Sequence, residues 1–163
     1  MEAAVPLDPK LFIAAPLWST LLLELHRRTE DRHESGAFLL GVKADDHRKV
    51  QHIVYYDQLD PRAYSSGVCI LHADSFGPLW DLCRARDLAV VADIHVHPCP
   101  AWQSEADRRN PMIARAGHLA LIVPWFARPP VSLPTLGFFE YRGDHQWRDL
   151  SGRNIDRYLI IKE

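Results

Sequence analysis

Residues 88–97 read Leu88-Ala89-Val90-Val91-Ala92-Asp93-Ile94-His95-Val96-His97. Side chains alternate between the two faces of a strand, so residues at every second position share a face. The even positions from 90 to 96 are apolar, whereas the odd face carries Asp93, His95 and His97. Pro98 cannot continue the ladder of a central strand, so the chain must leave the sheet there. This stretch predicts a strand with one buried face and two imidazoles directed to one point on the other.

The segments around this strand predict helices and strands in irregular alternation. Apolar residues at helical spacing predict helices over residues 17–32 and 76–87, the second capped by Asp74 or Ser75. Asn110-Pro111 would open a short helix that ends at Gly117. Further strands are expected at residues 11–15, 36–42, 50–56, 118–123, 136–142, 146–150 and 158–161. Because strands 36–42 and 50–56 flank a short polar turn, they should form a hairpin. We predict an α/β (α+β) fold with a mixed sheet flanked by helices.

The composition is that of an ordinary globular protein. The 163 residues are 47% hydrophobic and 25% charged, which excludes a disordered, collagen-like or coiled-coil chain and predicts one domain over residues 1–163. A net charge of −2 gives no electrostatic reason to expect nucleic acid or a membrane surface as the main partner. No apolar run approaches the about 18 residues of a membrane span, and the first residues lack the pattern of a signal peptide. Three cysteines without CxxC spacing favour a reducing, cytoplasmic location.

A carboxylate follows the two histidines at metal-ligand spacing. Asp107 lies ten positions after His97, in the run Ser104-Glu105-Ala106-Asp107. Two imidazoles and one carboxylate are three protein ligands, and a catalytic zinc site keeps its fourth position for water. Zinc lowers the pKa of that water to about 7, and a separate base must then take its proton. Glu34, which precedes a predicted buried strand, is a candidate for this base, although its sequence context alone resembles a solvated helix end.

These residues together resemble the JAB/JAMM metalloproteases, whose fold is called MPN. The resemblance runs from the first predicted helix to the sheet after His118, and its motifs are Glu34 before Gly36-Ala37-Phe38-Leu39-Leu40-Gly41, His95-x-His97-Pro98 and Ser104-x-x-Asp107. It implies a curved MPN-type sheet and one Zn2+ per chain bound by His95, His97 and Asp107. It also implies that Glu34 is the general base and acid, and that Ser104 donates a hydrogen bond to the tetrahedral oxyanion.

The resemblance further implies a substrate. The family cleaves isopeptide or peptide bonds after the C-terminal tail of ubiquitin-like proteins, so a ubiquitin-like protein or its conjugates would be the partner. Residues 117–124 look most like bacterial members encoded beside ubiquitin-like conjugation systems, some of them in antiviral defence loci. Two alternatives are a peptidase that releases a small molecule such as cysteine from a sulfur-carrier protein, and an inactive MPN scaffold. The loops at 57–67 and 125–134 would form the walls of the substrate groove. The oligomeric state is not predicted.

The chain departs from the family pattern in two places, and several residues have a second interpretation. Val96 stands where Ser or Thr is usual, and six residues rather than seven separate His97 from Ser104. Ser104-x-x-Asp107 also matches a helix cap, which is compatible with metal binding. Asp93 could orient a ligand imidazole or form a salt bridge. His118 is expected in the core rather than as a ligand, and Cys99 is expected to be neither ligand nor nucleophile. Trp102 and Trp125 would either contact a partner or pack locally.

Overall fold

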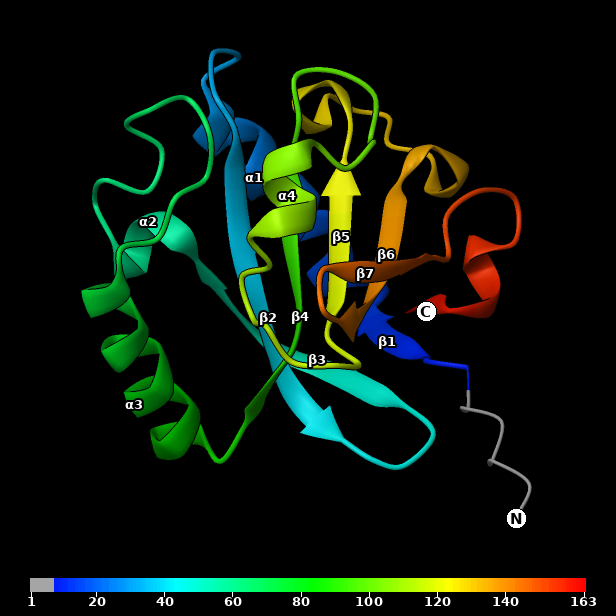
Figure 1. Cartoon of the computed structure of the whole chain (residues 1–163). Coiled ribbons are helices and arrows are strands. Elements are labelled where there is room, and N and C mark those ends of the chain that lie inside the picture. Colours follow the sequence, from blue (N-terminus) through cyan, green and yellow to red (C-terminus); the bar gives the residue numbers. More distant parts are fainter. Residues whose placement is uncertain (1–7) are drawn as a thin grey trace.

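The computed structural model describes residues 8–163 and has the predicted α+β organisation (Figure 1). The helices are α1 (Ala15–Thr29), α2 (Tyr56–Leu59), α3 (Phe76–Arg86) and α4 (Glu105–Arg109). The strands are β1 (Leu11–Ala14), β2 (Ser35–Lys43), β3 (Arg48–Tyr55), β4 (Ala89–Val96), β5 (Leu119–Val123), β6 (Gly137–Gly143), β7 (Gln146–Asp149) and β8 (Leu159–Lys162). Short 3-10 turns lie at 73–75, 125–127, 133–135 and 155–157.

The strands form a curled, mixed sheet in the order β7-β6-β5-β4-β2-β3-β1-β8. Strands β4 and β5 run parallel, as do β1 and β3 and also β1 and β8, whereas the other neighbours are antiparallel. The predicted hairpin is the β2–β3 pair, closed at residues 44–47. The histidine strand β4 therefore lies between β2 and β5, in the interior of the sheet. The predicted mixed sheet is confirmed.

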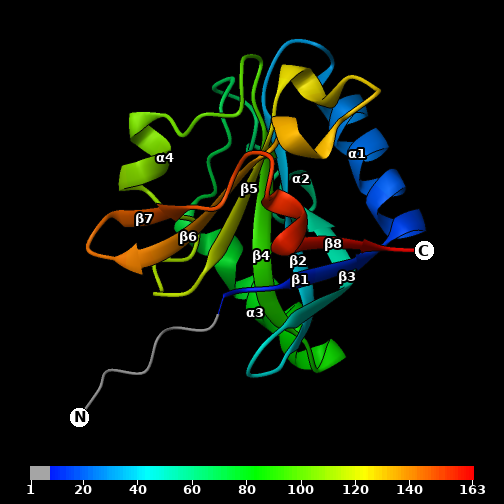
Figure 2. The ribbon, with the colours of Figure 1, turned by 90° about the vertical axis from the view of Figure 1, so that its right-hand side faces the viewer.

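The helices cover opposite faces of the sheet. Figure 2, which views the sheet nearly along its edge, shows α1 on one side and α4 on the other. Trp18, Leu21 and Leu25 of α1 pack on the large core, which also contains Ile94 and Val96 of β4. A second core lies under α3 on the opposite face. Ala92, Ile94 and Val96 of the predicted apolar face are thus buried in the large core with α1, and the opposite face, with Asp93 and His95, opens toward α4. Val90 packs in the second core instead, because a register shift opposite Leu39 and Leu40 interrupts the alternation.

Three helix predictions need correction. The short helix runs from Glu105 to Arg109 and not from 111 to 117, because the cap at Ser104 starts it earlier. Pro111 then disfavours helical dihedral angles at the preceding residue, Asn110, so the helix ends before the proline. Helix α1 ends at Thr29 rather than near Arg32, because Glu30 adopts a left-handed conformation with φ 52°. The expected cap at position 74 or 75 of α3 is also wrong. Ser75 has helical dihedrals and makes no capping hydrogen bond, because a 3-10 turn leads into the helix.

Within residues 8–163, no helix has both the length and the apolar composition that a membrane crossing would require.

Candidate metal centre

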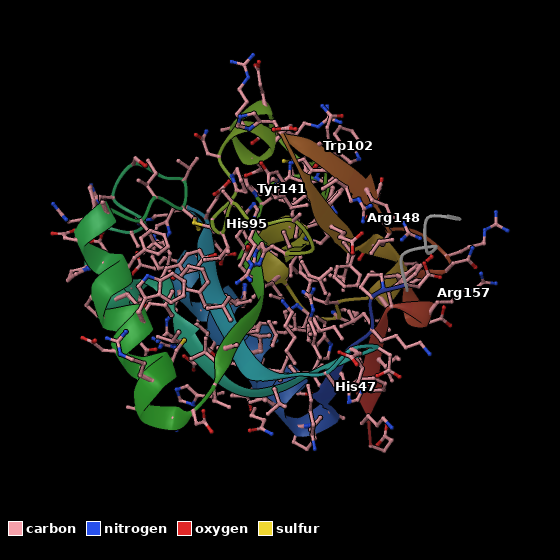
Figure 3. All side chains as sticks on the ribbon, turned by 60° about the horizontal axis from the view of Figure 1, so that its bottom comes forward. His47, His95, Trp102, Tyr141, Arg148 and Arg157 are labelled. Carbon is pink, nitrogen blue, oxygen red and sulfur yellow. The ribbon has the colours of Figure 1, made fainter. Side chains whose placement is uncertain are left out.

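His95 and His97 converge at the end of β4, as the strand pattern predicts. Their Nε2 atoms lie 2.8 Å apart, and both residues are buried. Figure 3 shows His95 deep within the packed side chains, whereas Arg148 and Arg157 lie toward the outside. The backbone of His97 continues the sheet, since its N–H donates to Val123 O at 2.9 Å. Two rigidly held nitrogen atoms therefore face one point.

An unusual turn fixes the chain beyond His97. The N–H of Phe126 donates to His97 O at 2.9 Å, and His26 of α1 donates through Nδ1 to Phe126 O at 2.7 Å. Trp125, Phe126 and Ala127 have φ values of 55°, 57° and 54°. A left-handed conformation costs an L residue roughly 1–2 kcal/mol. Such strain persists only where the surrounding contacts determine it, and here those contacts hold the backbone of a candidate metal ligand.

The cap of α4 positions Asp107 beside the histidines. The N–H of Ser104 donates to Asp107 Oδ2 at 2.8 Å, and the N–H of Asp107 donates to Ser104 Oγ at 3.1 Å. This reciprocal capping box leaves Asp107 Oδ1 at 3.3 Å from His95 Nε2 and Oδ2 at 3.3 Å from His97 Nε2. The helix-cap interpretation of Ser104-x-x-Asp107 is therefore confirmed, and the cap leaves the Asp107 carboxylate beside both imidazoles. The Ser104 hydroxyl accepts one hydrogen bond and retains its own hydrogen to donate.

Glu34 approaches the histidines from the start of β2. Its Oε1 lies 3.6 Å from His97 Nε2, and its side chain is 14% exposed. Its Oε2 accepts a hydrogen bond from the N–H of Cys69 at 2.9 Å. The structure therefore brings Glu34, His95, His97 and Asp107 to one place, although the sequence distributes them over more than seventy positions.

The electrostatics of this cluster favour a bound cation. Burial lowers the pKa of the His95 imidazole, but Asp107 and, more weakly, Glu34 and Asp93 outweigh burial, so that this pKa is raised. Burial raises the pKa of Asp107, but hydrogen bonds from His95 and His97 outweigh it and hold the Asp107 pKa well below its usual range. Both directions show that the cluster stabilises positive charge between the imidazoles and the carboxylate.

The donor set also fits a metal ion. Glu34, His95 and His97 each offer one ligand atom within 4.8 Å of the others. Tetrahedral zinc with Zn–N distances of about 2.0–2.1 Å places two nitrogen ligands roughly 3.4 Å apart. The 2.8 Å between the imidazole nitrogens is about 0.6 Å shorter than that spacing, so a small separation of the two rings would match it. Two carboxylates adjoin the pair, Asp107 near both imidazoles and Glu34 near His97.

A cleft of about 620 Å³ opens onto this cluster. Its apolar walls include Val68, Ile70 and Leu71 on one side and Pro111 and Met112 on the other. The expected walls, 57–67 and 125–134, contribute none of the described residues that line it. The wall expected at 57–67 is formed instead by the residues that follow this loop, Val68, Ile70 and Leu71. Part of the second loop, with Trp102, lines a separate groove of about 500 Å³.

The structure settles the positions of the remaining candidates. Asp93 Oδ2 and His118 Nε2 form a buried hydrogen-bonded pair at 2.5 Å, so Asp93 pairs with His118 rather than with a candidate ligand, and the core position of His118 is confirmed. Cys99 is exposed, and the group that could hold a metal contains no cysteine among the described residues. Sequence reasoning missed Cys69, which acts on Glu34 through its backbone N–H. A backbone donor leaves no signal in residue identity.

Comparisons with known proteins point to the same chemistry. No family model matches the chain. The chain is 28% identical over 144 residues to a protein of Sinorhizobium fredii named probable metalloprotease y4jG, and the alignment covers 88% of each chain. A solution structure from Desulfitobacterium hafniense is similar with a TM-score of 0.66 and 18% identity, covering 94% of this chain and 93% of that one. Another, from Salinibacter ruber, has a TM-score of 0.57 and 20% identity, covering 84% and 86%. These two likenesses show the fold alone.

Proposed function

We propose that this protein is a zinc-dependent metalloprotease of the JAMM type that cleaves after the C-terminal tail of a ubiquitin-like protein. The observation that carries the proposal is the pair of imidazole nitrogens 2.8 Å apart, with the Asp107 carboxylate 3.3 Å from each and Glu34 beside them. The similarity to a probable metalloprotease over 88% of the chain supports the reaction class.

The residues divide into ligands and acid–base groups. His95, His97 and Asp107 would hold one zinc ion, and Asp107 is assigned here because it adjoins both imidazoles. Zinc, when bound, would polarise the scissile carbonyl and lower the pKa of attacking water from about 16 to about 7. Glu34 would accept the proton of that water at Oε1 and return it to the leaving amine. Ser104 would donate its hydroxyl hydrogen to the carbonyl oxygen as negative charge develops there.

The cleft supports an extended peptide as substrate. Val68, Ile70 and Leu71 form an apolar wall beside Glu34, and α4 lies across from it. An extended tail could lie between these walls and present its last peptide bond to the histidines. On the resemblance of the motifs, we assign the tail to a ubiquitin-like protein or its conjugate in a bacterial ubiquitin-like or antiviral defence system. Nucleic acid and membranes are not part of this proposal.

The decisive experiment compares Glu34→Gln with Asp107→Ala on a ubiquitin-like protein fused through its natural tail to a reporter. Glu34→Gln retains size but cannot accept a proton, so cleavage should fall by about 10²–10⁴-fold while zinc content stays near one per chain. Asp107→Ala should lose zinc and cleavage together, because it removes one of three protein ligands. Glu105→Gln, an exposed carboxylate two residues from Asp107, is the matched control and should behave as wild type.

Three results would contradict the assignment. Zinc loss in Glu34→Gln would make Glu34 a ligand. Normal cleavage by that variant would place the base elsewhere. The third result is that the zinc-loaded wild type does not cut the fusion. Turnover of a sulfur-carrier tail would then identify a sulfur-carrier peptidase, and turnover of no tail would identify an inactive scaffold.

A further inference from the structure

The loop from Asp60 to His72 holds Glu34 through two hydrogen bonds made by its backbone groups. The N–H of Glu34 donates to Gly67 O at 2.9 Å, and the N–H of Cys69 donates to Glu34 Oε2 at 2.9 Å. One carboxylate oxygen is therefore occupied, and the other, Oε1, is the one that faces His97 at 3.6 Å. A carboxylate free to rotate would exchange these two oxygens, so the amide of Cys69 selects the orientation.

A tyrosine fastens the same loop to the strand that carries Glu34. The N–H of Gly36 donates to the Tyr64 hydroxyl oxygen at 3.2 Å, and the hydroxyl donates to Gly36 O at 3.1 Å. The ring of Tyr64 stacks on His33, with 5.4 Å between centroids. Tyr64 thus contacts His33 and Gly36, which lie before and after Glu34 in the sequence.

A buried carboxylate closes the loop at its two ends. The side chain of Asp60 is 1% exposed. Its Oδ1 accepts from the backbone N–H of Arg62 at 2.9 Å and from Arg62 Nε at 3.3 Å. Its Oδ2 accepts from the backbone N–H of His72 at 3.1 Å and from His72 Nδ1 at 2.6 Å. Burial raises the pKa of Asp60, but the hydrogen bonds from His72 and Arg62 outweigh it and hold this pKa well below its usual range.

We propose that the loop 60–72 positions Glu34. In this proposal Asp60 holds the two ends of the loop together, and Tyr64 attaches the loop to β2. The inference rests on the proposed function, since it gives Glu34 the role of base. The same loop presents Val68 and Ile70, which are 48% and 46% exposed, as a wall of the cleft. The same loop would therefore both contact the substrate and orient the base. Asp60 and Tyr64 are positioning residues and not catalytic residues.

The first measurement reads the hydrogen bond itself and needs no activity. In the full-length protein as purified, the amide proton of Cys69 should be shifted downfield and protected from exchange in an NMR experiment. Tyr64→Phe and Asp60→Ala should reduce both the shift and the protection. Asp60→Asn keeps one acceptor oxygen and should give an intermediate result. Tyr158→Phe, the same chemical change at a ring away from Glu34, is the matched control and should leave the amide of Cys69 unchanged.

The second measurement separates positioning from a purely structural role. A misplacement of about 1 Å can cost about 10²-fold in rate, so we expect Tyr64→Phe to lower kcat by about 10- to 100-fold with little change in KM. In the Glu34→Gln background, Tyr64→Phe should cause no further loss, because both changes act through one carboxylate. Asp60→Asn should recover part of the kcat lost in Asp60→Ala, and zinc content should not change in any of these variants.

The outcomes distinguish failure of this inference from failure of the proposed function. A rise in KM at constant kcat would make the loop a substrate wall only and overturn the inference. An additive loss in the double variant, or an unchanged Cys69 amide in Tyr64→Phe, would overturn it as well. If the wild type cleaves no substrate but the Cys69 amide responds as described, the proposed function fails and the hydrogen-bonded loop stands. If Asp60→Ala does not fold, Tyr64→Phe alone decides.

Discussion

Asp93 and His118 form a buried pair on the same sheet face as the metal cluster. Their side chains are 4% and 3% exposed, and Oδ2 of Asp93 lies 2.5 Å from Nε2 of His118. Asp93 shares a strand face with His95 and lines the same cleft, but its hydrogen bond joins it to His118 rather than to a candidate ligand. The pair therefore joins β4, which carries the histidines, to the residue that precedes the parallel neighbour β5.

We expect Asp93→Ala to destabilise the fold strongly. Removing one partner of a buried pair leaves the other without compensation and costs about 3–5 kcal/mol. Asp93→Asn should cost less, because its amide oxygen still accepts from His118. Asp81→Ala removes an exposed carboxylate paired with Arg84 and serves as the control. Urea denaturation measures the difference in the free energy of unfolding. A similar value for Asp93→Ala and Asp81→Ala would show that the buried pair contributes little.

The site was predictable where a residue acts through its own side chain. His95 and His97 follow from the strand period, and the position of Asp107 follows from the cap with Ser104. Glu34 needed the family resemblance, because in the sequence it stands among other charged residues at a helix end. The support for Glu34 from Cys69 and Asp60 was not predictable, because it passes through backbone N–H groups and a loop closure that any sequence of similar polarity could contain.

Among the elements, β2 has the tightest packing requirements. It lies between β3 and β4, and residues 35–41 are buried. A Cβ on Gly36 would lie 2.4 Å from the Tyr56 ring and 2.9 Å from Ile94 O. A Cβ on Gly41 would lie 1.8 Å from Lys49 O, at the point where the β2–β3 register shifts. The two glycines that bracket the motif at 36–41 are therefore explained by close approach of neighbouring groups.

Gly41→Ala should destabilise the β2–β3 hairpin. The obstructing atom belongs to backbone, which cannot rotate away, so the strand itself must shift, at a cost of about 1–3 kcal/mol or more. Gly77→Ala in α3 is the control, because nothing lies within 4 Å of its added Cβ. Thermal unfolding should show a lower Tm for Gly41→Ala and an unchanged or slightly higher Tm for Gly77→Ala. Equal Tm values for the two variants would mean that the bulge accommodates a methyl group.

Element prediction succeeded for the strands and was weakest in the helix near the site. Strands have a period of two and a buried face, which residue identity records directly. The helix 105–109 has five residues, none of them buried, so no apolar stripe marks it. Asn110-Pro111 carried the helix-start signal, but the capping box at Ser104 and Asp107 placed the helix before the proline rather than after it.

At the scale of the whole molecule, the large hydrophobic core and the metal cluster lie on opposite faces of the sheet. The large core joins α1 to the face of the sheet opposite the cluster, and it contains residues from most strands. The cluster lies at one end of β4, where the short helix α4 supplies Asp107 and the start of β2 supplies Glu34. An isolated helix of this length is not stable in water. The bound metal should therefore stabilise α4 and its flanking loops more than it stabilises the sheet.

Metal removal should consequently lower stability without unfolding the protein. Free zinc at about 100 times its Kd would stabilise the folded state by about 2.7 kcal/mol, so chelation should lower Tm by an amount that depends on zinc concentration and is restored when zinc is added back. Far-UV circular dichroism should change little. Hydrogen exchange should become faster in residues 98–117 and remain slow in β2, β4 and β5. Asp107→Ala, treated in the same way, should show no dependence on added zinc. Global unfolding on chelation would make the metal a structural requirement of the fold, and an identical zinc response in Asp107→Ala would place the ion elsewhere.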